Sequence, residues 1–230
     1  MLINQTKNIF EEGQVLLLNK PLEWTSFDVV RKIRNTCKTK KVGHAGTLDP
    51  LASGLLILCT GKFTKKINEY MAREKEYIGS FTVGAVTPTY DLESDPENFR
   101  DCSSITIDQL EKLTSKFKGE LLQIPPMHSA IKKDGKRVYE LARKGQTIEL
   151  EPRKIIIKEF EITSIELPKV FFRVVCSTGT YIRSLANDFG QELGCGAYLS
   201  SLCRTRIGEF SIKDSLTMEE AVEYINRMIG

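Results

Sequence analysis

Residues 43–59 read GHAGTLDPLASGLLILC, a glycine-punctuated loop that leads directly into an apolar run. Its three glycines at positions 43, 46 and 54 allow positive φ, and Pro50 disfavours a helical conformation for Asp49. The run Leu55–Cys59 is short, unbroken and apolar, which is typical of a buried strand. We therefore predict that Asp49 lies on a shaped loop anchored to the core. An Asx-turn, in which Asp49 caps its own backbone, is the alternative.

On both sides of this loop the hydrophobic spacing predicts an irregular succession of strands and helices. Strands are expected at residues 14–18, 77–83, 155–165 and 170–176. Helices are expected from Thr25 or Ser26 through Ile33, over residues 63–71 and 107–117, after a Thr180 cap, and over residues 218–228. Residues 91–104 are acidic and predict a surface loop. No linker separates these segments, so we expect a single domain over residues 1–230.

The composition is that of an ordinary globular protein, with 33 basic and 30 acidic residues among 230 and a net charge of +3. The basic residues are unevenly distributed, because residues 31–41 carry six of them and no acid, and a second cluster spans residues 132–144. Such local clusters are typical of phosphate binding. A solvated helix face is the simpler alternative.

Several classes of site are not indicated by the sequence. The six cysteines form no C-x-x-C pair and the chain has only two histidines, so we expect no zinc site, no other metal and no cofactor. Cys59 and Cys176 lie in apolar runs and are expected in the core. No apolar run approaches membrane-spanning length, and the first ten residues are too polar for a signal peptide. We therefore expect a cytoplasmic protein that makes no membrane contact.

The loop resembles the catalytic-loop motif of the TruB family of pseudouridine synthases. The match over residues 43–56 is gapless, and it is far more specific than a short glycine fingerprint. The resemblance continues in order along nearly the whole chain, in KP and WTS at residues 20–26, KEYIG at 75–79, PPMHSA at 125–130, GTYIR at 179–183 and LSSLCRT at 199–205.

This resemblance implies an α/β (α+β type) fold with a mixed, largely antiparallel sheet flanked by helices. It also implies conversion of uridine to pseudouridine at position 55, in the T-loop of tRNA, with Asp49 as the nucleophile. The reaction breaks the C1'–N1 bond, turns the uracil and joins C5 to C1'. Attack at C1', attack at C6 and removal of a sugar proton to give a glycal all remain open.

The resemblance assigns two more catalytic residues. Arg183 matches the arginine that the family pairs with the aspartate, and an opposite charge nearby would keep the carboxylate ionised. Tyr77 matches the tyrosine that stacks on the target base and whose hydroxyl can help proton transfer. Taken alone, Arg183 would be interpreted as a surface arginine and Tyr77 as a core strand residue.

Four further residues match positions that contact the substrate. Tyr181 and Leu202 match residues lining the uracil pocket, although each alone would be assigned to the core. Asp91 resembles a pocket-side acid, although acidic loops are common. His44 matches the histidine that contacts RNA around the position left by a flipped-out uridine, and a loop histidine bonded to backbone is the alternative.

Residues 125–150 resemble the thumb-like insertion with which the family grips RNA. Its phosphate-binding candidates are Lys132, Lys133, Lys136, Arg137 and Arg143. His128 departs from the tyrosine of many relatives, and the stretch after Phe210 is too short for the added PUA module that many of them carry. We expect a monomer that binds the T-arm of tRNA without guide RNA. Two rival hypotheses are a non-catalytic tRNA-binding or tRNA-folding protein and a guide-RNA-dependent enzyme that modifies ribosomal RNA.

Overall fold

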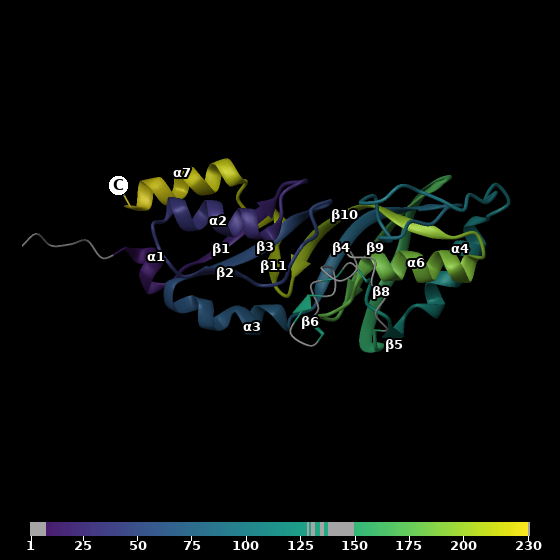
Figure 1. The fold of residues 1–230 in the computed structure, drawn as a ribbon, viewed down its shortest axis with the longest axis horizontal. Helices are drawn as coiled ribbons and strands as arrows, with labels where there is room; N and C mark the ends of the chain where they lie inside the picture. Colours follow the sequence, from purple (N-terminus) through teal and green to yellow (C-terminus); the bar gives the residue numbers. More distant parts are fainter. Residues whose placement is uncertain (1–7, 128, 130–131, 134–135, 138–149, 230) are drawn as a thin grey trace, which may run out of the picture. The chain divides into compact units, whose positions relative to one another are not determined.

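The computed structural model describes residues 8–127, 129, 132–133, 136–137 and 150–229 (Figure 1). The chain divides into two compact units, Met1–Tyr77 with Cys203–Gly230, and Ile78–Leu202. Strands β4 (Lys75–Val83) and β10 (Ala197–Ile207) each contribute residues to both units. The single domain over residues 1–230 stays a prediction.

In the first unit, β3 (Ala52–Thr60) is the central strand. It pairs antiparallel with β1 (Val15–Lys20), where Leu18 lies opposite Leu56, and with β2 (Val42–His44). The short strand β11 (Phe210–Ser211) pairs with the end of β10. The buried strand predicted after the Asp49 loop is thus confirmed, and the loop is the connection between β2 and β3.

Alternate residues of β3 contribute to two different apolar clusters, as expected for a strand covered on both faces. Leu56 and Leu58 pack with residues of α2 (Ser26–Thr36) and α7 (Met218–Ile229). Leu55, Ile57 and Cys59 pack in the other cluster, which includes α3 (Ile67–Met71). Figure 1 shows α2 and α7 on one side of these strands and α3 on the other.

Helix α2 begins where the sequence predicts, because Thr25 and Asp28 form a capping box in which each side chain binds the backbone N–H of the other residue. The Thr25 hydroxyl accepts a hydrogen bond from the Asp28 N–H, and the Asp28 carboxylate accepts one from the Thr25 N–H, both at 3.0 Å. The helix predicted over residues 63–71 is shorter than expected, because Gly61–Lys66 forms the 3-10 helix η1 and only α3 is α-helical. The remaining elements of this unit are α1 (Ile9–Glu12) and η2 (Ile212–Asp214).

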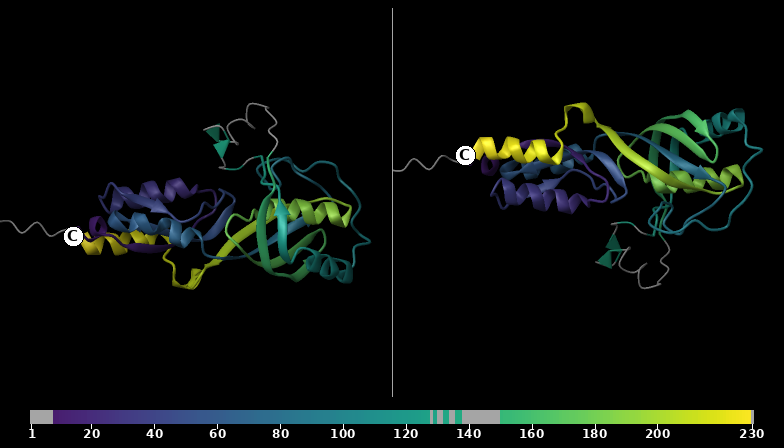
Figure 2. Two further views of the ribbon diagram at one scale, coloured as in Figure 1. Left: turned by 90° about the horizontal axis from the view of Figure 1, so that it is seen from below. Right: turned by 90° about the horizontal axis from the view of Figure 1, so that it is seen from above.

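In the second unit the strand order is β10, β4, β9 (Lys169–Cys176), β8 (Arg153–Glu166) and β5 (Gly119–Gln123). β8 pairs antiparallel with both β9 and β5. Helix α4 (Ile107–Lys116) contacts β8 and α6 (Ile182–Leu193) (Figure 2). Five aromatic rings with centroids 4.8–6.4 Å apart fill the core, from Phe81, Phe117, Phe160, Phe172 and Phe189. The predicted strands and the helix near residues 107–117 are confirmed.

The predicted cap of α6 is wrong. The helix begins at Ile182 after an extended Tyr181, and the Thr180 hydroxyl instead donates to the carbonyl of Ser177 at 3.0 Å. Most of the insertion, including Arg143, lies outside the described residues. In its described part, β6 (Lys132–Lys133) pairs with β7 (Lys136–Arg137), and its grip on RNA stays a prediction.

Candidate active site

The Asp49 loop has the shape that its glycines allow. Gly46 and Gly54 have φ values of +98° and +105°, whereas Gly43 does not adopt a positive φ. A side chain at Gly54 would also collide with the backbone of Arg204. The N–H of Ala52 donates to the carbonyl of Asp49 at 3.0 Å, which closes a turn across Pro50. Asp49 is half-buried at this turn.

The first residue of α2 holds the loop from one side. The buried hydroxyl of Ser26 donates to the carbonyl of Leu48 at 3.1 Å and accepts from the Leu48 N–H at 2.9 Å. Both backbone groups of the residue before Asp49 are therefore fixed by one side chain. The capped start of α2 thus contributes directly to the position of the loop.

Arg204 holds both ends of the loop. Arg204 is 1% exposed, and its guanidinium donates to the carbonyl of Leu55 at 2.8 Å, of Gly46 at 3.1 Å and of Thr47 at 3.4 Å. Charged donors make stronger hydrogen bonds than neutral ones, and a fork-shaped guanidinium can serve several carbonyls at once. The loop is therefore tied to the strand that follows it through one buried side chain.

Lys20, at the end of β1, is a second buried cation of this unit. Its ammonium group donates to the carbonyls of Trp24 at 2.5 Å, Pro21 at 2.8 Å and Pro50 at 3.4 Å. Burial lowers the pKa of Lys20 to about 8, while the charge of Asp49 acts to raise this pKa and that of Arg204 to lower it. The Asp49 loop therefore lies within the electrostatic reach of a fully buried lysine.

Two other predicted site residues lie in the same unit. His44 ends β2, and its pKa is lowered chiefly by burial, with the Gly46 backbone opposing the shift and Arg204 adding to it. The lowered pKa favours the neutral imidazole over the charged one. Tyr77 is 8% exposed on β4. The contact of His44 with RNA and the stacking of Tyr77 on a base stay predictions.

In the second unit, the structure brings Arg183 and Asp91 together. Both residues are 4% exposed, the Arg183 Nε lies 3.6 Å from Asp91 Oδ2, and Nη1 donates to the carbonyl of Thr89 at 3.3 Å. Arg183 is thus no surface arginine. A buried guanidinium needs such partners, because it cannot lose its charge. Tyr181, which precedes α6, and Leu202, on β10, are both half-buried.

Four residues that shape these two regions were not predicted from the sequence: Lys20, Ser26, Gln123 and Arg204. Three of them stand inside stretches that carried the resemblance, namely KP, WTS and LCRT. Their place within matched motifs was the one available signal for Lys20 and Arg204, because sequence periodicity does not show that a charge will be buried. Gln123 hydrogen-bonds the backbone N–H and carbonyl of Tyr181.

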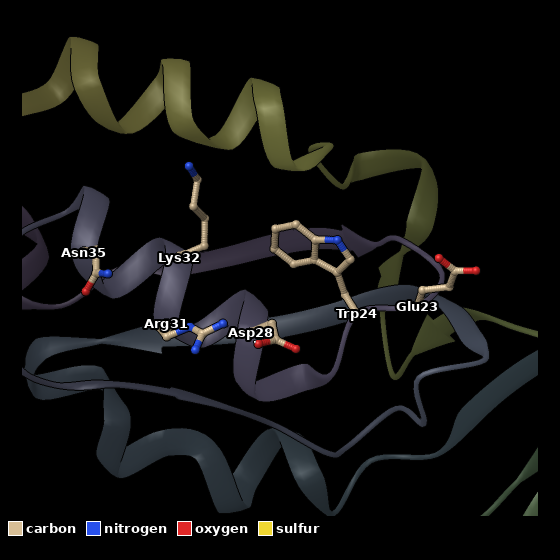
Figure 3. Close-up of a pocket in the computed structure, with 6 residues that line it drawn as sticks. All are labelled: Glu23, Trp24, Asp28, Arg31, Lys32 and Asn35. Carbon is tan, nitrogen blue, oxygen red and sulfur yellow. Dashed lines mark hydrogen bonds and ion pairs between the residues drawn. The ribbon is translucent and has the colours of Figure 1, made fainter. Parts of the chain in front are cut away.

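A surface hollow of about 330 Å³ lies along α2 and the two residues Glu23 and Trp24 before it (Figure 3), and its other lining residues are Asp28, Arg31, Lys32 and Asn35. None of the predicted site residues lines it. Arg31 and Asp28 already pair with each other at 2.7 Å, so the charges of the hollow partly cancel. The hollow therefore adds nothing to the candidate active site.

Neither a metal-binding cluster nor a membrane-spanning helix is present among the described residues. In that part of the chain, no group of three or more His, Cys, Asp and Glu side chains is placed to hold a metal ion. No helix among the same residues has the length and apolar character needed to cross a membrane.

Two known family domains together match residues 34–228 of the chain. Residues 34–182 match the N-terminal domain of the TruB family pseudouridylate synthases, and residues 183–228 match the tRNA pseudouridylate synthase B C-terminal domain. The tRNA pseudouridine synthase B of Flavobacterium johnsoniae is 51% identical over 218 residues, which are 92% of this chain and 95% of that protein. The protein of the same name from Phocaeicola vulgatus is 49% identical and covers 95% of both chains.

Solved structures support the predicted fold class. A chain in the crystal structure of a Cbf5-Nop10-Gar1 complex is similar with a TM-score of 0.74 at 29% identity, and a chain of an H/ACA RNP bound to substrate RNA has a TM-score of 0.71 at 28% identity. The matches cover 96% and 94% of this chain, respectively, but only 60% and 54% of those chains. The described sheet is mostly antiparallel and flanked by helices, as predicted. On the family match and the relatives at about half identity, this chain belongs to the TruB family of pseudouridine synthases.

Proposed function

We propose that this chain isomerises uridine to pseudouridine in tRNA. The observation that carries the proposal is the similarity to proteins named tRNA pseudouridine synthase B, at 49–51% identity over more than nine-tenths of both chains. The anchored Asp49 loop agrees with this activity. Its carbonyls are occupied by Arg204 and Lys20, so the turn that carries the carboxylate is preorganised.

The finer proposal is that the target is uridine 55 in the T-loop and that Asp49 is the nucleophile. A uridine stacked in an RNA loop must be flipped out before a half-buried carboxylate can reach it. The carboxylate then attacks C1' or C6, or removes a sugar proton, and the C1'–N1 bond breaks. The detached uracil is retained until C5 joins C1', any bond to the carboxylate breaks, the C5 proton leaves to a base and N1 ends protonated. No external electron donor or acceptor takes part in this isomerisation.

The other residues are proposed to act in the same reaction. Arg183 supplies the positive charge that stabilises the carboxylate, and Tyr77 supplies the aromatic face for the base. Tyr181, Leu202 and Asp91 belong to the uracil pocket, and His44 contacts RNA around the vacated position. The ion pair of Arg183 with Asp91 supports this assignment, because it holds the guanidinium in one orientation.

We further propose that the chain acts as a monomer in the cytoplasm, on the T-arm, without guide RNA or cofactor. The solved relatives include components of H/ACA complexes, so a guide-dependent enzyme is the serious alternative. The higher identity, 51% against 28–29%, favours the stand-alone reading. A non-catalytic RNA-binding protein is less well supported, because phosphate binding requires neither Asp49 nor Arg183.

The test is to incubate the purified chain with an unmodified tRNA transcript and to map pseudouridine at single-nucleotide resolution. We expect one new pseudouridine at position 55, with no added metal, cofactor or guide. A transcript with cytidine at position 55 is the control and should gain none. Activity that appears only with an added guide RNA would replace this proposal with the guide-dependent alternative.

A further inference from the structure

Gln123 is a buried polar side chain at the end of an edge strand. It is 4% exposed, whereas its neighbours Leu122 and Ile124 are 70% and 58% exposed. The chain at the end of β5 therefore directs its one amide inward and the apolar side chains on either side of it outward, which reverses the usual pattern. Burying an amide is unfavourable unless its polar atoms are hydrogen-bonded, so the partners of Gln123 define what it does.

Both polar atoms of the Gln123 amide bind the same residue. Its Oε1 accepts a hydrogen bond from the Tyr181 N–H at 2.8 Å, and its Nε2 donates to the Tyr181 carbonyl at 3.0 Å. This pairing fixes the orientation of the amide, since the carbonyl oxygen must face the N–H. It also fixes the peptide groups on both sides of Tyr181.

Tyr181 occupies the position from which α6 starts. It is the N-cap residue with φ −97° and ψ 112°, and no side chain of its own caps the helix. Its carbonyl also accepts the first helical hydrogen bond, from the Leu185 N–H at 3.0 Å. One turn later the Ser184 hydroxyl donates to the carbonyl of Ile124 at 2.8 Å. Gln123 thus supplies, from β5, an acceptor for the N–H of the N-cap residue, which in a capping box comes from the side chain at the third helical position.

We propose that Gln123 is a positioning residue for catalysis, which fixes the turn from Tyr181 to Arg183 and acts only through those residues. The inference rests on the proposed function, because it concerns residues proposed to bind and stabilise the reacting uridine. Arg183 follows Tyr181 by two residues at the start of a rigid helix. A rotation of the Tyr181 peptide therefore changes the direction of the guanidinium and of the tyrosine ring together.

The diagnostic variant is Gln123→Glu, which changes one atom of the side chain and makes the contact depend on pH. An ionised carboxylate still accepts from the Tyr181 N–H, but its second oxygen faces the Tyr181 carbonyl and repels it. Protonation restores a donor, and burial moves the pKa of this carboxyl above its usual value. We expect the single-turnover rate to be roughly 10- to 100-fold below wild type at pH 8 and to recover most of that loss by about pH 6.

Two further variants separate positioning from folding. Gln123→Met has similar size and neither polar atom, so its rate should be low at every pH. Gln109→Glu is the matched control, because Gln109 is exposed and needs only its accepting oxygen, which bonds the Thr106 N–H at 2.9 Å. It should follow wild type at every pH. The affinity for tRNA should stay within about threefold for all three variants.

Hydrogen exchange at the Tyr181 amide gives a readout independent of activity. This amide should exchange faster in Gln123→Met than in wild type, and in Gln123→Glu it should stay protected because an acceptor remains. A Gln123→Glu rate that parallels the wild-type rate across pH would overturn the proposal. The proposal would also be overturned if the rates of the Gln123 variants fell only as much as their fraction of folded protein or their affinity for tRNA. If wild type itself forms no pseudouridine, the proposed function fails, and the exchange data still report whether Gln123 holds Tyr181.

Discussion

The Asp49 loop and the Tyr181–Arg183 turn carry opposite charges and are held by opposite kinds of group. Two buried cations, Lys20 and Arg204, donate to carbonyls around the acidic loop. Around the basic turn, Asp91 forms an ion pair with Arg183, and the carbonyl of Thr89 accepts a hydrogen bond from it. The neutral amide of Gln123 holds the backbone of the turn. Asp49 and Arg183, the charges proposed to act in the reaction, thus each lie in a region whose supporting groups carry the opposite charge or none. We therefore expect substitutions of Asp49 and Arg183 to affect mainly the chemistry, and substitutions of Lys20 and Arg204 to affect mainly the stability.

The largest effect is expected for Asp49→Asn. This variant keeps the size and hydrogen-bonding capacity of the side chain but removes its charge and most of its nucleophilicity. We expect single-turnover formation of pseudouridine to fall by roughly 10³-fold or more, while equilibrium binding of tRNA is unchanged or tighter. Retention of a near-normal rate would show that the loop does not carry the chemistry.

Arg183→Lys should cost less, about 10²-fold in single-turnover rate, because a flexible point charge replaces a planar group that can pair with Asp91 and Thr89 together. Arg173→Lys is the matched control. Arg173 pairs with Glu159 at 2.6 Å at the partly exposed surface of β9, where such pairs contribute little. Equal losses in the two variants would contradict a special role for Arg183.

Arg204→Met should act mainly on stability. Three carbonyls of the loop and β3 lose a charged donor inside the protein, so we expect the free energy of unfolding to fall by about 2–4 kcal/mol in urea titration. Arg206→Met, on the same strand, should cost no more than about 1 kcal/mol, because its pair with Glu74 is partly exposed. A small effect at Arg204 would mean that the loop holds its shape without this anchor.

The smallest expected effect is a pH dependence from Lys20, whose pKa is lowered from 10.5 to about 8. Between these values the unfolded state keeps a proton that the folded state has released, so this group makes the free energy of unfolding rise with pH. Its contribution is complete above 10.5 and is lost as the pH falls through 8. From pH 7 to pH 9, wild type should gain about 1 kcal/mol relative to Lys20→Met. Parallel pH profiles would indicate an unshifted lysine.

Local sequence rules succeeded where the determining contacts are themselves local. The buried strand after the Asp49 loop follows from an apolar run, and the start of α2 follows from the capping pair Thr25 and Asp28, three residues apart. The same rules failed at α6. Threonine is a common cap residue, but the Thr180 hydroxyl donates to the carbonyl of Ser177. The N–H of Tyr181 is instead bound by Gln123, which lies 58 positions away in the chain.

By itself, the sequence determined the family, the Asp49 loop and the order of most strands and helices, because motif spacing and hydrophobic periodicity are properties of neighbouring residues. Only the tertiary structure decided which polar side chains hold the functional segments. Arg204 and Leu55 are 149 positions apart, and Lys20 and Pro50 are 30 apart. Such contacts depend on which strands become neighbours in the sheet. Burial lowers the pKa of Lys20 and also removes the ion pair of Arg183 with Asp91 from water. This burial likewise exists only once the core has closed around these groups.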